Sequence, residues 1–274
     1  ILPGVVVSPA SLPGIKRWQV TKKVLESTRI IKWHPNNQKV AFAGGQYNAS
    51  VIHIYQLEKN KLTLTNILPI AWCHVINAME WSPDGKWLTV TGSTQNHNKY
   101  AKLDIFETKT LTREKSIALA TASGNDVQWT QDSQKLYIVE RNKISSCSPD
   151  NNFELVNEGF KPSIGNTFSK MAFAPDKNLI AFSTNRQKLL IYDGDKKLHK
   201  ELGNESTGHR WTELRWSPDG KYLILEYSGQ HHSLVWNTKT WKQVNEIKPI
   251  KFESDWSPDG NFLAIGSPGN PYSK

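Results

Sequence analysis

Trp81-Ser82-Pro83-Asp84-Gly85-Lys86 is the stretch that decides the fold, because the chain repeats it. The same six residues return at 216–221, and positions 256–261 differ only in ending with Asn261. Weaker copies fill the intervals between them. Aromatic anchors therefore recur every 40 to 48 residues, at Trp33, Trp81, Trp129, Phe173, Trp216 and Trp256. A repeat of this length with strand-like flanks predicts an all-β fold, a β-propeller.

Each copy lies between two short apolar stretches, such as 76–81 and 87–91 in the second repeat. Short runs of this kind, bounded by turn residues, indicate strands. In the phrase itself, proline presets φ, aspartate bonds its own backbone, and glycine supplies a positive φ. The phrase therefore predicts a tight hairpin. The aromatic anchor at the end of the first strand is expected to pack between neighbouring sheets.

Two further strands are expected in each repeat, the third often ending in an aromatic residue and the fourth more polar. The expected third strands are 51–55, 100–106, 143–146, 189–192 and 233–236, and the expected fourth strands are 61–68, 113–119, 153–156 and 242–247. Four antiparallel strands form a propeller blade, so six anchors predict a six-bladed β-propeller. The third repeat is the least regular, since its Asp132-Ser133 turn lacks proline and glycine.

The ends of the chain are expected to complete the last blade. The last repeat holds only two strand-like stretches, 252–256 and 262–265, whereas two spare apolar stretches, 5–8 and 15–20, precede the first repeat. N-terminal strands that close the last blade would remove exposed sheet edges. Residues 1–274 are accordingly expected to form a single domain.

At these residues the chain resembles the WD40 repeats and the WD40-like, TolB-type repeats of bacteria. Both families share the Trp-Ser-Pro-Asp-Gly-Lys turn, and the fifth repeat is most similar to WD40 in its Gly208-His209 pair and its stretch 235–240, Val-Trp-Asn-Thr-Lys-Thr. WD40 blades contain a buried tetrad of His, Ser or Thr, Asp and Trp. Here only the fifth repeat has the Gly-His pair, and its 226–232 turn lacks the Asp. Packing, rather than that tetrad, is therefore expected to hold most blades.

Composition narrows the class of protein. Hydrophobic residues make up 38% of the chain, and no apolar stretch approaches the ~18 residues of a membrane span. Cys73 and Cys147 lie in different repeats without metal-ligand spacing, so two free thiols are expected. We expect a monomer, and the sequence leaves cytoplasmic and periplasmic locations open.

The formal net charge of +9 favours an acidic partner, because charge complementarity speeds association. The lysines are scattered, however, and neither a long basic run nor a nucleic-acid-binding motif is present. We therefore expect a protein partner and no nucleic acid.

Catalytic motifs are absent from the sequence. It contains no Gly-x-Ser-x-Gly elbow, no P-loop, no Gly-x-Gly-x-x-Gly and no His-Glu-x-x-His. His231 and His232 are adjacent, and adjacent strand residues point to opposite faces, so they cannot readily share a metal ion. No catalytic residue, metal site or cofactor is predicted.

One enzymatic alternative stays open, a Ca²⁺-dependent hydrolase of the lactonase type. Such six-bladed propellers bind Ca²⁺ in the central channel through carboxylates and amides. The first strands offer residues of these kinds three and four positions before the anchors: Asn77, Asn125, Asp126, Glu213 and Glu253. A wet channel also accounts for them, and for Arg29, Ser169 and Lys170 at equivalent places.

The best-supported function is a non-enzymatic protein-interaction scaffold, with a periplasmic TolB-like accessory protein as a further alternative. Loops entering the first strands converge on one face of a propeller, and loops on rigid scaffolds carry binding residues. Tryptophan and arginine dominate binding hot spots. The predicted partner face comprises Arg29, Asn77, Phe168, His209, Arg210, Trp211 and Lys251. Packing of Phe168 and Trp211 beneath their own loops is the alternative.

Overall fold

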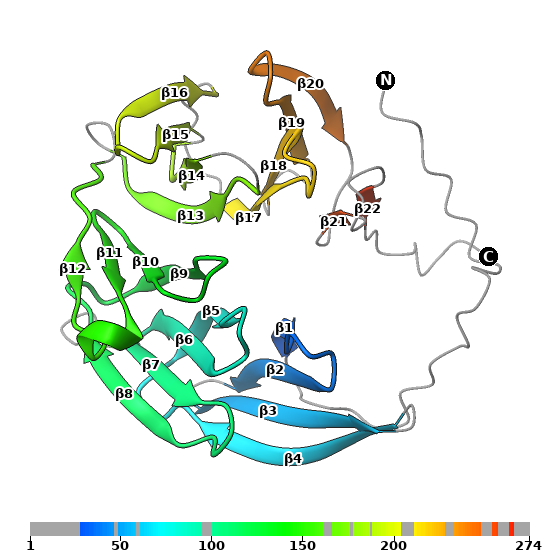
Figure 1. Ribbon diagram of the computed structural model, residues 1–274, viewed down its shortest axis with the longest axis vertical. Helices are drawn as coiled ribbons and strands as arrows, with labels where there is room; N and C mark the ends of the chain where they lie inside the picture. Colours follow the sequence, from blue (N-terminus) through cyan, green and yellow to red (C-terminus); the bar gives the residue numbers. More distant parts are fainter. Residues whose placement is uncertain are drawn as a thin grey trace. The chain divides into compact units, whose positions relative to one another are not determined.

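The computed structural model describes residues 28–46, 49–58, 61–94, 100–161, 166–175, 178–186, 188–203, 211–227, 233–247, 254–256 and 263–265. Over these ranges the chain forms five four-stranded antiparallel sheets and one two-stranded sheet (Figure 1). The helical content of these residues is one 3₁₀ turn, η1 (Pro149–Asn151). The all-β class and the four-stranded blade are therefore confirmed. The number of six blades, and their closure by N-terminal strands, stay predictions, since residues 1–27 lie outside the described ranges.

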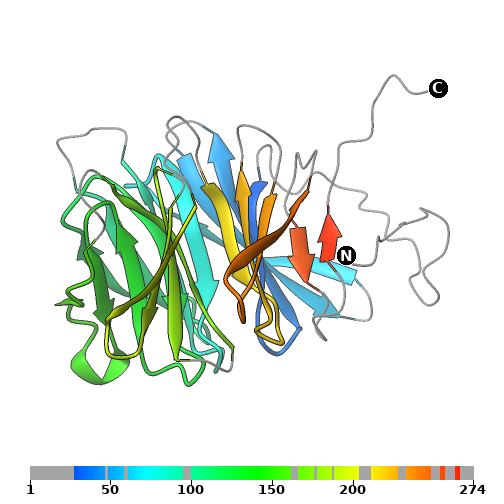
Figure 2. The ribbon, with the colours of Figure 1, turned by 90° about the horizontal axis from the view of Figure 1, so that it is seen from above.

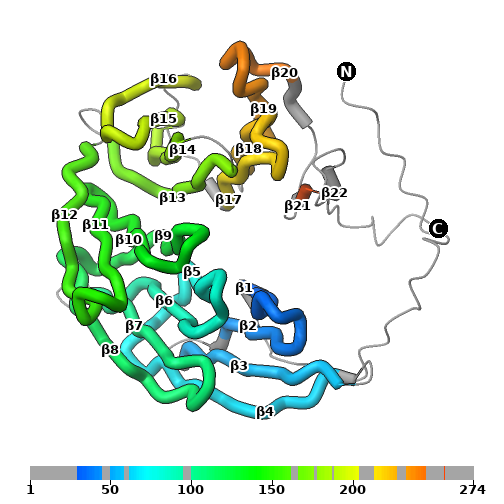
Figure 3. Tube along the Cα trace, viewed as in Figure 1, coloured from blue at the N-terminus to red at the C-terminus, as the bar shows by residue number. Residues whose placement is uncertain are grey.

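One compact unit, Val24–Met171, holds three complete blades. Each has its strands in sequence order, with the first strand innermost and the fourth outermost (Figures 1 and 3). The first strands are neighbours, β1 beside β5 and β5 beside β9. The strands are β1 (Thr28–Trp33), β2 (Lys39–Gln46), β3 (Ala49–Glu58), β4 (Lys61–Pro69), β5 (Val75–Trp81), β6 (Trp87–Ser93), β7 (Lys102–Glu107), β8 (Arg113–Ala118), β9 (Gly124–Trp129), β10 (Leu136–Glu140), β11 (Ile144–Cys147) and β12 (Val156–Asn157).

A second unit takes up the chain from Ala172 onward. The remaining sheets follow the same order, β13-β14-β15-β16 and β17-β18-β19-β20, with β21 and β22 as a pair, and the boundary between the units falls within β13. The strands are β13 (Phe168–Phe173), β14 (Leu179–Thr184), β15 (Leu189–Asp193), β16 (Leu198–Leu202), β17 (Trp211–Trp216), β18 (Tyr222–Tyr227), β19 (Ser233–Asn237), β20 (Lys242–Ile247), β21 (Ser254–Trp256) and β22 (Leu263–Ile265).

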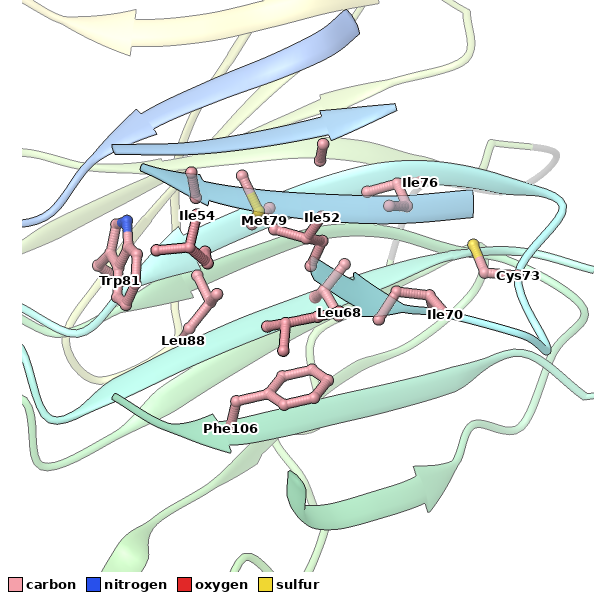
Figure 4. Packing of buried hydrophobic residues seen from close by; sticks show 13 residues of the cluster. Ile52, Ile54, Leu68, Ile70, Cys73, Ile76, Met79, Trp81, Leu88 and Phe106 are labelled. Atoms are coloured by element: carbon pink, nitrogen blue, oxygen red, sulfur yellow. The ribbon is translucent and has the colours of Figure 1, made fainter. Parts of the chain in front are cut away.

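All six predicted anchors end a first strand, as the repeat indicates. Trp81 packs in the core between the first two blades, which Figure 4 shows together with Ile52, Ile54 and Leu88. Its indole Nε1 donates to the carbonyl of Lys32, 3.1 Å away, one residue before the previous anchor. Trp216 repeats this bond, because its Nε1 donates to the carbonyl of Ala172 at 3.1 Å. Trp81 and Trp216 thus fix the spacing of neighbouring sheets by packing and by a hydrogen bond, whereas the first anchor, Trp33, is 49% exposed.

The repeated phrase folds as a hydrogen-bonded hairpin turn. Asp84 Oδ1 accepts from Ser82 Oγ at 2.6 Å and from the Lys86 amide at 3.0 Å. Gly85 has φ +73°, which is the reason for glycine at that position. The turn at 217–221 has the same bonds at the same lengths.

The third repeat builds the same turn without proline or glycine. Asp132 Oδ1 accepts from Thr130 Oγ1 at 2.6 Å and from the Gln134 amide at 3.0 Å. Ser133 occupies the glycine position with φ +60°. The Ser133 hydroxyl accepts a hydrogen bond from the amide of Asp84 at 2.9 Å. This bond joins the turns of the second and third blades.

The fourth strands depart most from the sequence prediction. The expected strand at 153–156 is wrong in extent, since β12 is only Val156–Asn157. Ser148 caps the 3₁₀ turn η1, drawn at one end of this sheet in Figure 2. Phe153 then takes a positive φ of 58°, which is left-handed rather than extended backbone, so it cannot join a strand. In the fourth repeat, β16 was not expected because its sequence, Leu-His-Lys-Glu-Leu, has little apolar character.

Both cysteines are free and buried. Burial raises the pKa of the Cys73 thiol to about 11 and that of the Cys147 thiol to about 12. At neutral pH both thiols are therefore protonated and poor nucleophiles. Across the described ranges, no helix has the length and apolar character needed to cross a bilayer.

Candidate binding surface at the first strands

The first strands share a β-bulge at the residue four positions before the anchor. It occurs in each first strand whose pairing is described at that position. The pairing of β1, β5, β9 and β17 with the second strand skips one residue each, namely Arg29, Asn77, Asn125 and Thr212. A bulge leaves its residue unpaired and redirects the side chain. The repeat therefore presents this one position in the same way, blade after blade.

Asn77 uses its bulge position to tie the second blade to the third. Its Nδ2 donates to the carbonyl of Gly124 at 2.9 Å and to Ser93 Oγ at 2.8 Å, and lies 3.2 Å from Ser123 Oγ. Gly124 stands five positions before the next anchor. The amide of Asn77 thus binds the backbone of the neighbouring first strand.

Asn125 repeats the same contact one blade later. Its Nδ2 donates to the carbonyl of Phe168 at 2.9 Å, again five positions before the next anchor. Its Oδ1 accepts from Ser123 Oγ at 2.9 Å, which links it to the bonds of Asn77. A continuous polar chain therefore runs from β5 through β9 to β13.

Carboxylates one and three positions before the anchors have the same role. Asp126 Oδ2 accepts from the amide of Met171 at 3.0 Å, and Asp126 Oδ1 lies 3.6 Å from Lys170 Nζ. Glu80 Oε2 accepts from the amide of Trp129 at 3.0 Å. These side chains satisfy backbone groups on the open edge of the next first strand, which would otherwise be unpaired.

These bonds leave little of the proposed Ca²⁺ site. Asn77, Asn125 and Asp126 bind backbone groups of the next strand, and Glu213 Oε1 lies 3.6 Å from Arg215 Nη2. Glu253 lies outside the described residues. Within the described ranges, no three His, Cys, Asp or Glu side chains are grouped so as to hold a metal ion. Asn77, Asn125 and Asp126 are best explained as connections between blades, whereas Glu213 pairs within its own strand.

The predicted partner face is only partly described. Asn77 is half-buried in the bonds above, and the Phe168 side chain is 1% exposed, so it is buried and not presented to a partner. Arg29 and Trp211 lie in β1 and β17, and the structure describes their backbone but not their side chains. His209, Arg210 and Lys251 lie outside the described residues.

Sequence reasoning missed a buried polar cluster in the second blade. Asp104, fully buried on β7, accepts from Trp72 Nε1 at 2.8 Å and from Ser116 Oγ at 2.5 Å, and lies 3.4 Å from Arg113 Nη1. This blade is therefore held by a polar network as well as by packing. The only signal was that Asp104 lies between apolar residues in the third strand, in Leu103-Asp104-Ile105-Phe106.

Comparison with known families agrees with this architecture. Residues 67–100 match the WD domain, G-beta repeat, and residues 171–251 match the anaphase-promoting complex subunit 4 WD40 domain. The chain carries WD40-type repeats. The two WD40-type matches fall in different compact units, so each unit contains repeats of this type. No curated protein matches the chain.

Proposed function

We propose that this WD40-type protein is a non-enzymatic interaction module that holds another protein within an assembly. The proposal rests on one observation, namely that polar side chains of the first strands form hydrogen bonds to neighbouring blades. Asn77, Asn125 and Asp126 are occupied by bonds between blades, so these residues build a rigid scaffold and are not set out as ligands. Rigid scaffolds of this kind place recognition on their loops.

The match to a family named for a subunit of the anaphase-promoting complex supports an assembly role. By analogy, this chain acts as a subunit that provides a binding surface rather than catalytic residues. The hydrolase alternative loses two of its five candidate ligands, Asn125 and Asp126, whose side-chain oxygens already accept hydrogen bonds. No observation on the described residues favours a TolB-like accessory protein.

The proposed partner face is that of the loops entering the first strands, with Arg29 and Trp211 as its main contacts. Tryptophan and arginine supply large binding energies when a partner buries them. The net charge of +9 favours an acidic partner.

The test begins with affinity capture and mass spectrometry to identify the partner, followed by titration of Arg29→Ala and Trp211→Ala at low and high salt. The loss at Arg29 should shrink as salt rises, since exposed charges are screened. The loss at Trp211 should persist. Lys109→Ala, in the exposed turn after β7, is the control and should bind like wild type. Unchanged affinity in both variants, with circular dichroism showing folded protein, would move the site away from these loops.

A further inference from the structure

The fourth strands differ in how well their outer edges are guarded. A strand at a sheet edge has unpaired backbone N–H and C=O groups, and proteins protect such edges with charges, bulges or short strands. β8, β16 and β20 each contain charged residues and are five or six residues long. β4 has nine residues, and from Leu62 to its end at Pro69 it contains no charge.

The pairing of the third and fourth strands allows the fourth strands to be compared residue by residue. Every one of these fourth strands has a bulge opposite the same step of its third strand, at Thr65, Glu114, His199 and Val244. The residue after the bulge is Lys115 in β8 and Lys200 in β16, but Asn66 in β4 and Asn245 in β20. β20 still carries Lys242 and Glu246, so β4 is the one of these four strands that lacks both this lysine and any charge after its first residue.

The side chains of β4 are also open to solvent. Five consecutive residues, 63–67, are exposed, and two of them are apolar, Leu64 at 41% and Ile67 at 54%. β4 is the last strand of its sheet among the described strands, on the outer side in Figure 1. An extended, uncharged and exposed edge is a ready template for another strand.

We propose that the outer edge of β4 binds an extended segment of an acidic partner protein, which adds to the first blade as a fifth strand. This rests on the proposed interaction function and names a second surface for it. Backbone hydrogen bonds provide the affinity, because only an extended chain can pair with alternate N–H and C=O groups of β4. Charge selects the partner, since the chain carries +9 overall and the one charged residue of β4 is Lys61, its first residue. A second copy of the chain carries the same charge and is disfavoured.

The probe is a short synthetic peptide of alternating valine and threonine flanked by glutamates. Fluorescence anisotropy measures its binding to the full chain, and amide hydrogen exchange locates it. We expect saturable binding that slows exchange in residues 61–69. The same peptide with N-methyl groups on alternate residues, or with lysines in place of the glutamates, should bind at least about tenfold more weakly.

Matched variants separate β4 from the other edges. Asn66→Lys installs the residue that β8 and β16 already have, and it should weaken the peptide about tenfold, because the new ammonium group loses water beneath the added strand. Asn245→Lys, the same change at the same register position of β20, should leave affinity unchanged. Equal effects of the two variants, or equal binding of the N-methylated peptide, would overturn the proposal.

Two other occupants give different results. If the free protein already protects the outward-facing β4 amides, those that do not bond β3, the chain itself covers the edge and the proposal is wrong. If sedimentation shows a dimer that Asn66→Lys dissociates, the edge belongs to a second copy and the proposal is again wrong. Failure at β4 leaves the Arg29 and Trp211 titrations unaffected, so it is distinguishable from failure of the proposed function.

Discussion

Two turn glycines with nearly the same backbone have different surroundings. Gly85 and Gly220 have φ +73° and +67°. A Cβ on Gly85 would stand 2.6 Å from the His34 ring, whereas one on Gly220 would meet nothing closer than Pro175 at 3.9 Å. His34 Nε2 lies 3.0 Å from the carbonyl of Gly85 and bonds it, so the first two turns are joined at this point.

The substitutions Gly85→Ala and Gly220→Ala should therefore separate the cost of placing a side chain in left-handed backbone from the cost of its contact with His34. Both should cost about 1–2 kcal/mol for a side chain in left-handed backbone. Gly85→Ala should cost about 1 kcal/mol more, since His34 must move and lose its bond. Urea unfolding measures both variants, and His34→Ala in the Gly85→Ala background should add little. Equal losses would show that His34 adjusts freely.

The anchor tryptophans allow a second comparison. Trp81→Ala should cost about 3–5 kcal/mol, as expected for a large aromatic truncated in a packed core. Trp81→Phe should cost about 1 kcal/mol more than Trp129→Phe, because Trp81 Nε1 bonds the carbonyl of Lys32 whereas Trp129 Nε1 is buried without a hydrogen-bond partner among the described residues. Thermal melting of both Phe variants decides this, and a greater loss for Trp129→Phe would contradict it.

At the scale of elements, the strands that form hairpins around the repeated phrase were predictable and the outermost ones were not. The anchors and turn residues act locally, so their order in sequence is enough to place the first two strands of a blade. β12 and β16 depend instead on the capping by Ser148 and on pairing with the third strand. The connections by Asn77 and Asn125 were also beyond prediction, because the sequence shows polar residues at those positions but not what they bond.

Asn77 offers a test of these connections. Asn77→Leu keeps the approximate size and removes the bonds to Gly124 and Ser93, so it should destabilise the protein by about 1–3 kcal/mol. Asn142→Leu, at an exposed loop position, is the control and should change stability by less than about 0.5 kcal/mol. Urea unfolding measures both. A loss at Asn77 no larger than at Asn142 would mean that the Asn77 bonds add nothing, and that packing and the Asp84–Ser133 and Glu80–Trp129 bonds join the second and third blades.

At the scale of the whole molecule, closure of the last blade is the open structural question. Only two short strands, β21 and β22, are described in the last repeat, whereas the first five repeats have four. The sequence supplies two spare apolar stretches, 5–8 and 15–20, ahead of the first repeat. A sheet left with two strands exposes edges, and exposed edges promote aggregation.

Deleting residues 1–23 should therefore lower stability sharply and cause aggregation, since it removes both stretches. Deleting residues 1–4 removes neither and is the matched control, which should melt like the full chain. Differential scanning calorimetry measures stability, and light scattering measures aggregation. The physical reason is that strands from the N-terminus would pair with the last blade and cover its edge. A 24–274 chain that remains monomeric with an unchanged melting temperature would show that N-terminal strands do not complete this blade, and that its edge is protected in another way.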